Sequence, residues 1–227
     1  MMTNLAKFLL LSSWLLLLPT AVSSFAAKKR KGGGKKAAST NKGFGVPPPT
    51  LDDVLSKFRT RMPEDANNQN CPCNTNPGSL YKDCCGPLHR EEKLCTTMSD
   101  VLRSRYSAFA WRNVGHVIRT THKTSRDYTE DKIAWAKDLN KGGMFDSFEF
   151  VNLEAGPEED GANENEGFID FKVTLLAKED TVEALAGKET IVSERSKFFR
   201  DPEDGSWTYA TGEVQSDIRG LEGVPLN

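Results

Sequence analysis

The chain has 227 residues, of which 37% are hydrophobic and 9% aromatic, enough for one modest core but too few for a large enzyme of several layers. Its formal net charge of −2 conceals an asymmetry, because residues 1–44 hold eight Lys or Arg and no acid, which leaves residues 45–227 with a net charge of −10. Such an acidic body argues against nucleic-acid binding and against docking on anionic membranes, since both need a basic surface.

The first segment has the pattern of a targeting sequence. An apolar run from Phe8 to Val22 follows Lys7 and ends among small residues. This run is shorter than a bilayer-spanning helix requires and is typical of a secretory signal peptide, which we place at residues 1–24. An uncleaved membrane anchor is the alternative, and Pro19 disfavours it. We therefore expect no stable membrane insertion once the segment is processed.

Residues 25–50 predict a disordered basic transit or linker segment. Phe25 is followed by a stretch rich in Lys, Gly, Ala and Ser that contains no acid and closes with three prolines before Thr50. The arrangement resembles the bipartite plastid presequence of algae with secondary plastids, and it predicts a plastid protein. Secretion with a flexible basic linker is the alternative.

A short helix and a linker are expected at residues 51–68. Thr50 is a typical N-cap, and Asp52 and Asp53 place acids in the first turn, where they favour the helix dipole.

Four of the five cysteines fall within fifteen residues: Cys71, Cys73, Cys84 and Cys85. In one interpretation, two thiolates from each end of a short loop close a tetrahedron around a structural Zn²⁺, with Lys82 and Arg90 offsetting the negative charge. In the other, two disulfides staple a secreted loop. We favour zinc, because two bridges in so short a loop stabilise little and adjacent cysteines point in different directions. Four thiolates would fill the coordination sphere, which argues against hydrolase chemistry at the metal. The remaining Cys95 is expected to be a buried thiol.

Two helices are predicted after the cysteines. Apolar side chains recur every three or four positions and predict one half-buried helix over residues 99–121, capped by Thr97 or Ser99. A second helix is expected over residues 129–140, and the Gly pair at 142–143 would end it.

From residue 144 onward the hydrophobic period changes to two, which indicates strands. We expect four of them, at residues 144–155, 167–178, 188–201 and 206–214. The acidic stretch between Gly156 and Gly167 is predicted to be a surface loop. Helices followed by an antiparallel meander predict an α+β fold, in which a curved sheet forms a cone around the helices.

Several segments carry a resemblance to a known family. CPC…YKDCCGPLH (71–89) resembles the SEC-C motif, a zinc knuckle found at the tail of the SecA translocation ATPase. VLRSRYSAFAWRNVGHVIRTTH (101–122) is similar to the signature helix of YchJ-type proteins, and SERSKF (193–198) and SWTYATGEV (206–214) are similar to their last two strands.

The resemblance implies an SEC-C-like zinc knuckle at residues 69–90 and a nuclear-transport-factor-2-like, or cystatin-like, domain at residues 95–215, followed by a tail at 216–227. The chain departs from the family pattern in having ten residues between its cysteine pairs, where the motif usually has eight, and no cysteine near its C-terminus. The resemblance implies a fold and a metal, but no biochemical activity.

No catalytic motif stands out, and the candidate residues lie outside the knuckle. The candidates for lining a pocket in the cone are Arg103, Arg105, Tyr106, Trp207 and Tyr209. The weaker candidates for catalysis are His122 as a general base, Arg103 or Arg195 as an anion anchor, and Glu194. Each has a structural alternative: His122 as a partner of the helix dipole, Arg105 and Glu194 as an ion pair, and Trp207 and Tyr209 as core. His116, between apolar neighbours, is read as structural.

The favoured function is that of a binding module: the knuckle docks on a protein partner, and the cone holds a small ligand or serves as a scaffold. A small lyase, isomerase or hydrolase that uses the cone is the alternative, and a thiol redox protein is the third hypothesis. An enzyme would need an open cone that contains a titratable group.

Overall fold

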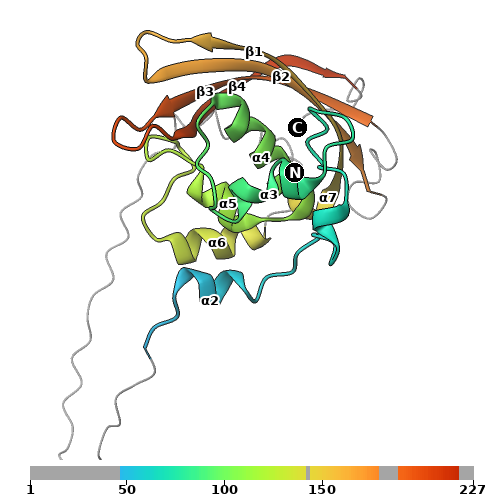
Figure 1. The fold of residues 1–227 in the computed structure, drawn as a ribbon, viewed down its shortest axis with the longest axis vertical. Coiled ribbons are helices and arrows are strands. Elements are labelled where there is room, and N and C mark those ends of the chain that lie inside the picture. The colour runs from blue at the N-terminus through green and yellow to red at the C-terminus, as the bar shows by residue number, and fades with distance from the viewer. Residues whose placement is uncertain (1–46, 142–143, 179–188, 220–227) are drawn as a thin grey trace, which may run out of the picture.

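A four-stranded antiparallel sheet with helices on one of its faces forms the protein (Figure 1). The computed structural model describes residues 47–141, 144–178 and 189–219. The predicted signal peptide, nearly all of the basic segment and the Gly pair at 142–143 lie outside these ranges. The strands lie in chain order: β1 (Phe148–Asp160), β2 (Glu166–Ala177), β3 (Glu189–Arg200) and β4 (Trp207–Arg219). The predicted α+β class is confirmed.

The strands differ from the sequence prediction at three places. β1 continues through Asp160, and Glu158 to Asp160 pair with Ile169 to Gly167, so most of the predicted acidic loop is strand. The acidic side chains suggested a loop because every residue from Glu154 to Asp160 is exposed, and an exposed strand tolerates charge. Residues 144–147, expected to be strand, form the short helix α7 (Met144–Ser147). β4 runs to Arg219, beyond the predicted end at 214 and into the predicted tail.

The helices and 3₁₀ turns precede the sheet in sequence. They are α2 (Leu51–Leu55), η1 (Ala66–Asn68), η2 (Tyr81–Asp83), α3 (Gly86–His89), α4 (Met98–Trp111), α5 (Val114–Arg119) and α6 (Lys132–Lys141). The cap predicted for α2 is present as a capping box between Thr50 and Asp53, and Thr97 caps α4 through the Asp100 amide. In the described ranges, no helix combines the length and apolarity that crossing a bilayer would require.

The single helix predicted over residues 99–121 is instead two helices with a sharp break. α4 ends at Arg112, whose backbone is left-handed at a φ of 62°, and the Asn113 side chain caps α5 by accepting from the His116 amide. The Arg112 side chain is 7% exposed and donates to the carbonyl oxygens of Arg59 and Asn140, both at 2.8 Å. The spacing of apolar residues continues across the break, so hydrophobic periodicity could not predict where α4 ends.

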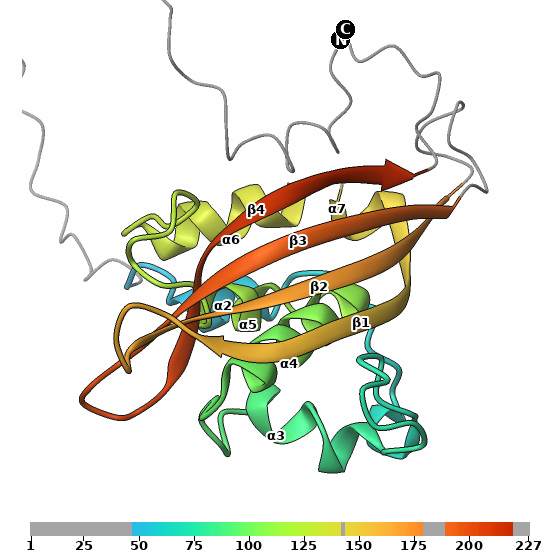
Figure 2. The same ribbon diagram turned by 90° about the horizontal axis from the view of Figure 1, so that it is seen from above.

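The core is shared between the knuckle and the sheet. Cys71, Cys73 and Cys85 belong to the same buried cluster as Tyr106 on α4 and Phe198 on β3. A second cluster joins α5, α6 and α7, with α2 packed against it. In Figure 2, which is seen from above, the strands pass over α4, and Figure 1 shows α6 and α2 on the far side of α4 from the sheet. The knuckle therefore packs into the domain and does not form a separate unit.

Candidate functional site

Two short segments bring the cysteines together. The Cys71 amide donates to the Ser79 carbonyl at 2.9 Å, and Gly78 turns the chain with a φ of 83° that favours glycine. Cys84 follows η2 and Cys85 begins α3. Because Cys71 lies on one side of this turn and Cys84 and Cys85 lie on the other, the sulfurs from both segments converge.

The four sulfur atoms have the spacing of a metal-binding cluster. The Sγ atoms of Cys71, Cys73, Cys84 and Cys85 all lie within 4.8 Å of one another. Cys84 Sγ is 3.5 Å from that of Cys73 and 3.9 Å from that of Cys85. A tetrahedral zinc with Zn–S bonds of about 2.3 Å would place its sulfurs about 3.8 Å apart. All five cysteines are free in the structure, so the disulfides of the alternative interpretation are not formed in it.

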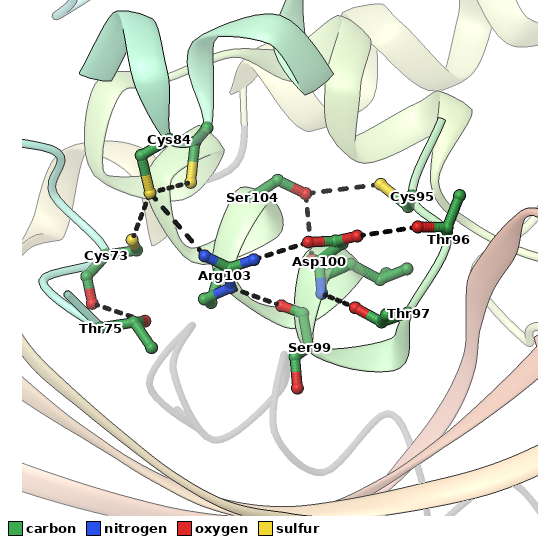
Figure 3. A network of polar contacts seen from close by, with 12 residues as sticks. Cys73, Thr75, Cys84, Cys95, Thr96, Thr97, Ser99, Asp100, Arg103 and Ser104 are labelled. Carbon is green, nitrogen blue, oxygen red and sulfur yellow. Dashed lines mark hydrogen bonds and ion pairs between the residues drawn. The ribbon is translucent and has the colours of Figure 1, made fainter. Parts of the chain in front are cut away.

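Helix α4 supplies polar contacts to the sulfurs. Arg103 Nη1 lies 3.8 Å from Cys84 Sγ, and the same guanidinium pairs with Asp100 at 2.6 Å (Figure 3). The Ser107 hydroxyl lies 3.3 Å from Cys85 Sγ and 3.7 Å from Cys71 Sγ. These contacts place a positive charge and a hydroxyl donor beside the cluster, where thiolate charge would gather.

The positive charge beside the sulfurs comes from Arg103, and not from Arg90 and Lys82 as predicted. Arg90 pairs with Glu92 at 2.8 Å, and Lys82 is exposed. Arg103 and Ser107 are four residues apart on α4, so both face the knuckle. That spacing was visible in the sequence, but the position of the knuckle relative to α4 was not.

The thiols cannot all ionise without a cation among them. Hydrogen bonds from Cys71, Cys84 and Cys85 hold the pKa of Cys73 well below its usual range. Hydrogen bonds to Cys71 and Cys73 hold the pKa of Cys85 far above its usual range. A divalent metal would stabilise all four thiolates together, because its charge offsets their repulsion. The cluster is therefore compatible with a bound metal ion.

A buried polar network lies beside the cluster. His89 Nε2 donates to the Ser104 carbonyl at 2.8 Å, and His89 Nδ1 accepts from the Tyr81 hydroxyl at 2.9 Å. His116 Nε2 lies 2.8 Å from the Ser104 hydroxyl, and its ring is 4.4 Å from that of His89. Cys95 is buried, as expected, with its sulfur 3.8 Å from the same hydroxyl. Burial lowers the pKa of His89 to about 4, so this network holds neutral imidazole.

The cone encloses a cavity of 450 Å³ between α4 and the concave face of the sheet. Most of its lining is aromatic or aliphatic, including Phe109, Phe150, Phe171, Val173, Phe198 and Val214. A volume of this size lies in the range of small-molecule pockets. The cone is therefore not filled by its own side chains.

One end of the cavity is polar. Arg105 lies with its guanidinium carbon 4.5 Å from the centre of the Tyr209 ring. Glu194 accepts hydrogen bonds from the Ser196 hydroxyl at 2.5 Å and the Tyr209 hydroxyl at 3.5 Å. The alternative that Arg105 and Glu194 form an ion pair is not met, because the salt bridges of the described residues do not include one between them.

A glycine makes room for the buried carboxyl. A Cβ atom at Gly212 would overlap the Glu194 carboxyl group, because the two residues lie on neighbouring strands. Gly212 was not among the predicted site residues, although a glycine inside a strand signals a close approach of this kind.

The structure divides the candidate residues between the cavity and other places. Those that line the cavity are Arg105, Tyr106, Glu194 and Tyr209. Arg103 lies at the cysteine cluster, and Trp207 packs against the core without lining the cavity. His122 bonds to Thr124 at 2.8 Å, and Arg195 pairs with Glu159 and Asp170, both outside the cavity. Of the four candidates for catalysis, only Glu194 reaches the cone.

Known proteins are similar to this chain in sequence and in fold. The family model described as "YchJ, middle NTF2-like domain" matches residues 97–212. A UPF0225 protein of Vibrio vulnificus is 33% identical over 149 residues, covering 65% of this chain and 76% of the relative. A UPF0225 protein of Photorhabdus laumondii is 30% identical over 154 residues, covering 68% of this chain and 83% of the relative.

One solved structure is similar to this chain in fold. The solution structure of an SEC-C motif containing protein from Rhodopseudomonas palustris is similar with a TM-score of 0.51 and 26% identity. The match covers 65% of this chain and 99% of that protein.

The comparisons correct the predicted localisation. The relatives are proteins of bacteria such as Vibrio and Photorhabdus, which points against plastid targeting. The prediction of a plastid transit peptide from the basic segment is therefore wrong. Many kinds of N-terminal extension are basic and lack acids, so this composition is weaker evidence of localisation than the bacterial origin of the relatives.

Proposed function

The chain belongs to the YchJ family, whose middle NTF2-like domain matches residues 97–212, and from this premise we propose that it is a zinc-containing binding protein. A structural zinc ion on the four thiols completes the knuckle, and the cone of the domain holds a small ligand. The observation that carries the binding role is the 450 Å³ cavity, which is lined mainly by apolar side chains and has one polar end.

The chemistry of the donors supports zinc. Four thiolates at tetrahedral spacing are a typical set for structural zinc, and they leave no open position for water. Bound zinc would hold the loop that bears Cys71 and Cys73 against α3, while Arg103 and Ser107 donate to the sulfurs. Because three of the cysteines belong to the main core, the metal would also stabilise the domain beneath.

The placement of side chains favours binding over catalysis. His122, the candidate general base, lies outside the cavity, and the described residues that line the cavity include no histidine or cysteine. Glu194 is the one catalytic candidate in the cone, and burial raises its pKa, although the Ser196 hydroxyl that donates to it acts in the opposite direction. We keep an enzymatic role as the second hypothesis, because an open cone with a titratable carboxyl meets its minimum requirement.

Two measurements on the purified full chain test the proposal. Metal analysis should find one zinc per chain, and the mass under non-reducing conditions should show no disulfide. Two disulfides and no metal would overturn the zinc assignment.

The cavity is tested with the neutral dye N-phenyl-1-naphthylamine, whose fluorescence rises in apolar surroundings. We expect saturable binding of one dye per chain. Val214→Trp, which fills the cavity, should abolish this binding, whereas Val151→Trp on the exposed part of β1 should not. Equal binding by both variants would show that the cone is not the site. Docking of the knuckle on a protein partner stays a prediction.

A further inference from the structure

We infer that the cone takes a small aromatic ligand bearing a single carboxylate, and that Arg105 pairs with this carboxylate. The inference rests on the proposed binding role and specifies the class of ligand. It is based on a guanidinium that is held in place without a carboxylate partner, on the aromatic walls and on the charges at the mouth.

Arg105 is held rigidly at the polar end of the cavity. Its Nη1 atom donates to the Val117 carbonyl at 2.9 Å and to the Thr120 and Thr121 hydroxyls at 3.1 and 2.9 Å. The Tyr209 ring covers one side of the guanidinium at 4.5 Å. Among the described residues, Arg105 makes its hydrogen bonds through Nη1 alone, and the side chain remains partly accessible where it lines the cavity. A ligand would therefore meet a preorganised donor group.

The charge of Arg105 has no ion-pair partner among the described residues. Glu194 is the acid at the same end of the cavity, but its Oε1 atom accepts from Ser196 and Tyr209. Burial raises the pKa of Glu194, which favours its neutral form. A guanidinium inside the fold with no carboxylate in contact is costly, and an incoming carboxylate would relieve that cost.

The walls suit a flat aromatic body. Phe109, Phe150, Phe171 and Phe198 line the cavity, and aromatic rings gain from edge-to-face and offset contacts beyond the area that they bury. The cavity of 450 Å³ accommodates a ligand of two fused rings.

The charges at the opening of the cavity disfavour a doubly charged ligand. The exposed residues that line the cavity are Arg126, Asp127, Asp138 and Thr211, so the opening carries two acids and one base. This excess of negative charge disfavours a phosphate ester more than a monocarboxylate, because repulsion grows with ligand charge.

Calorimetric titration of the zinc-loaded full chain tests the inference with three probes of one shape. They are 2-naphthoate, its neutral amide 2-naphthamide and 2-naphthyl phosphate. We expect 2-naphthoate to bind at one site per chain, at least tenfold more tightly than either of the other two. A charge-assisted hydrogen bond is worth at least about tenfold in affinity.

Single substitutions test which side chain causes the preference for the acid over the amide. Arg105→Gln should remove the preference for the acid over the amide, whereas Arg195→Gln, the same change on the opposite face of the sheet, should keep it. Should Arg105→Gln fail to fold, the ratio of acid to amide affinity in the unchanged chain still decides the matter. Val214→Trp should weaken both probes at least tenfold.

The outcomes separate this inference from the proposed function. Equal affinity for acid and amide, or tighter binding of the phosphate, would overturn the carboxylate assignment while leaving a ligand-binding cone in place. If neither the neutral dye nor any naphthyl probe binds, both the inference and the binding role are wrong.

Discussion

Acid should destabilise this protein through His89. The side chain is 6% exposed, and both ring nitrogens are engaged in the neutral form, with Nε2 donating to Ser104 and Nδ1 accepting from Tyr81. Protonation would bury a charge beside the His116 ring, whose centre is 4.4 Å away. The folded protein therefore resists binding a proton that the unfolded chain takes up freely.

The size of the effect follows from the two pKa values. Burial lowers the pKa of His89 from 6.5 to about 4. The folded state with neutral His89 is fully favoured above pH 6.5, and its advantage declines as the pH falls through the window from 6.5 to about 4. Between about pH 7.5 and pH 5, linkage gives a loss of about 2 kcal/mol in the free energy of unfolding from this residue alone.

Urea unfolding of the unchanged chain and of His89→Gln, followed by tryptophan fluorescence at several pH values, measures the effect. Acid also affects the cysteines, but this contribution is common to both proteins and largely cancels in the difference. His116 lies against His89, which helps to lower its pKa, so any change in the contribution of His116 has the same sign as that of His89. The stability advantage of the unchanged chain over His89→Gln should shrink by about 2 kcal/mol between about pH 7.5 and pH 5. His122→Gln is the matched control and should show a smaller pH dependence, since His122 is only partly buried.

A difference between the two proteins that stays constant with pH would refute the reasoning. It would mean that His89 titrates near its ordinary pKa and that the network around Ser104 accommodates the imidazolium. A difference that grows in acid would show that the charged form is the one that the fold stabilises.

Three further predictions concern the metal, the helix break and the cavity. Cys84→Ser should abolish zinc binding and lower the melting temperature, whereas Cys95→Ser should keep the zinc; metal content equal in both variants would contradict the cluster. Arg112→Ala should cost about 2 kcal/mol in urea unfolding, because it removes the hydrogen bonds of a buried guanidinium to the backbone carbonyls of Arg59 and Asn140; a loss below about 0.5 kcal/mol would show that the break does not depend on this side chain. Gly212→Ala should force Glu194 to move, at a cost of about 1–3 kcal/mol, and should alter dye affinity; unchanged stability and affinity would count against the close approach.

Local patterns in the sequence determined most of the strands, the helix caps and the cysteine cluster. The alternation in β2 places Ile169, Val173 and Leu175 in the core as expected, because the two faces of a strand differ strictly at a period of two. The capping residues Thr50 and Thr97 act where predicted, because a cap depends on neighbours within three positions.

Tertiary structure decided everything that depends on which segments meet. The break at Arg112 needs acceptors on Arg59 and Asn140, far away in sequence, and Arg103 reaches Cys84 only because α4 packs against the knuckle. The cavity exists because a twisted sheet closes over α4 and its side chains leave space, and neither fact is written in any local period. Sequence periodicity fixes which face of an element is apolar, while the distances between faces come from packing alone.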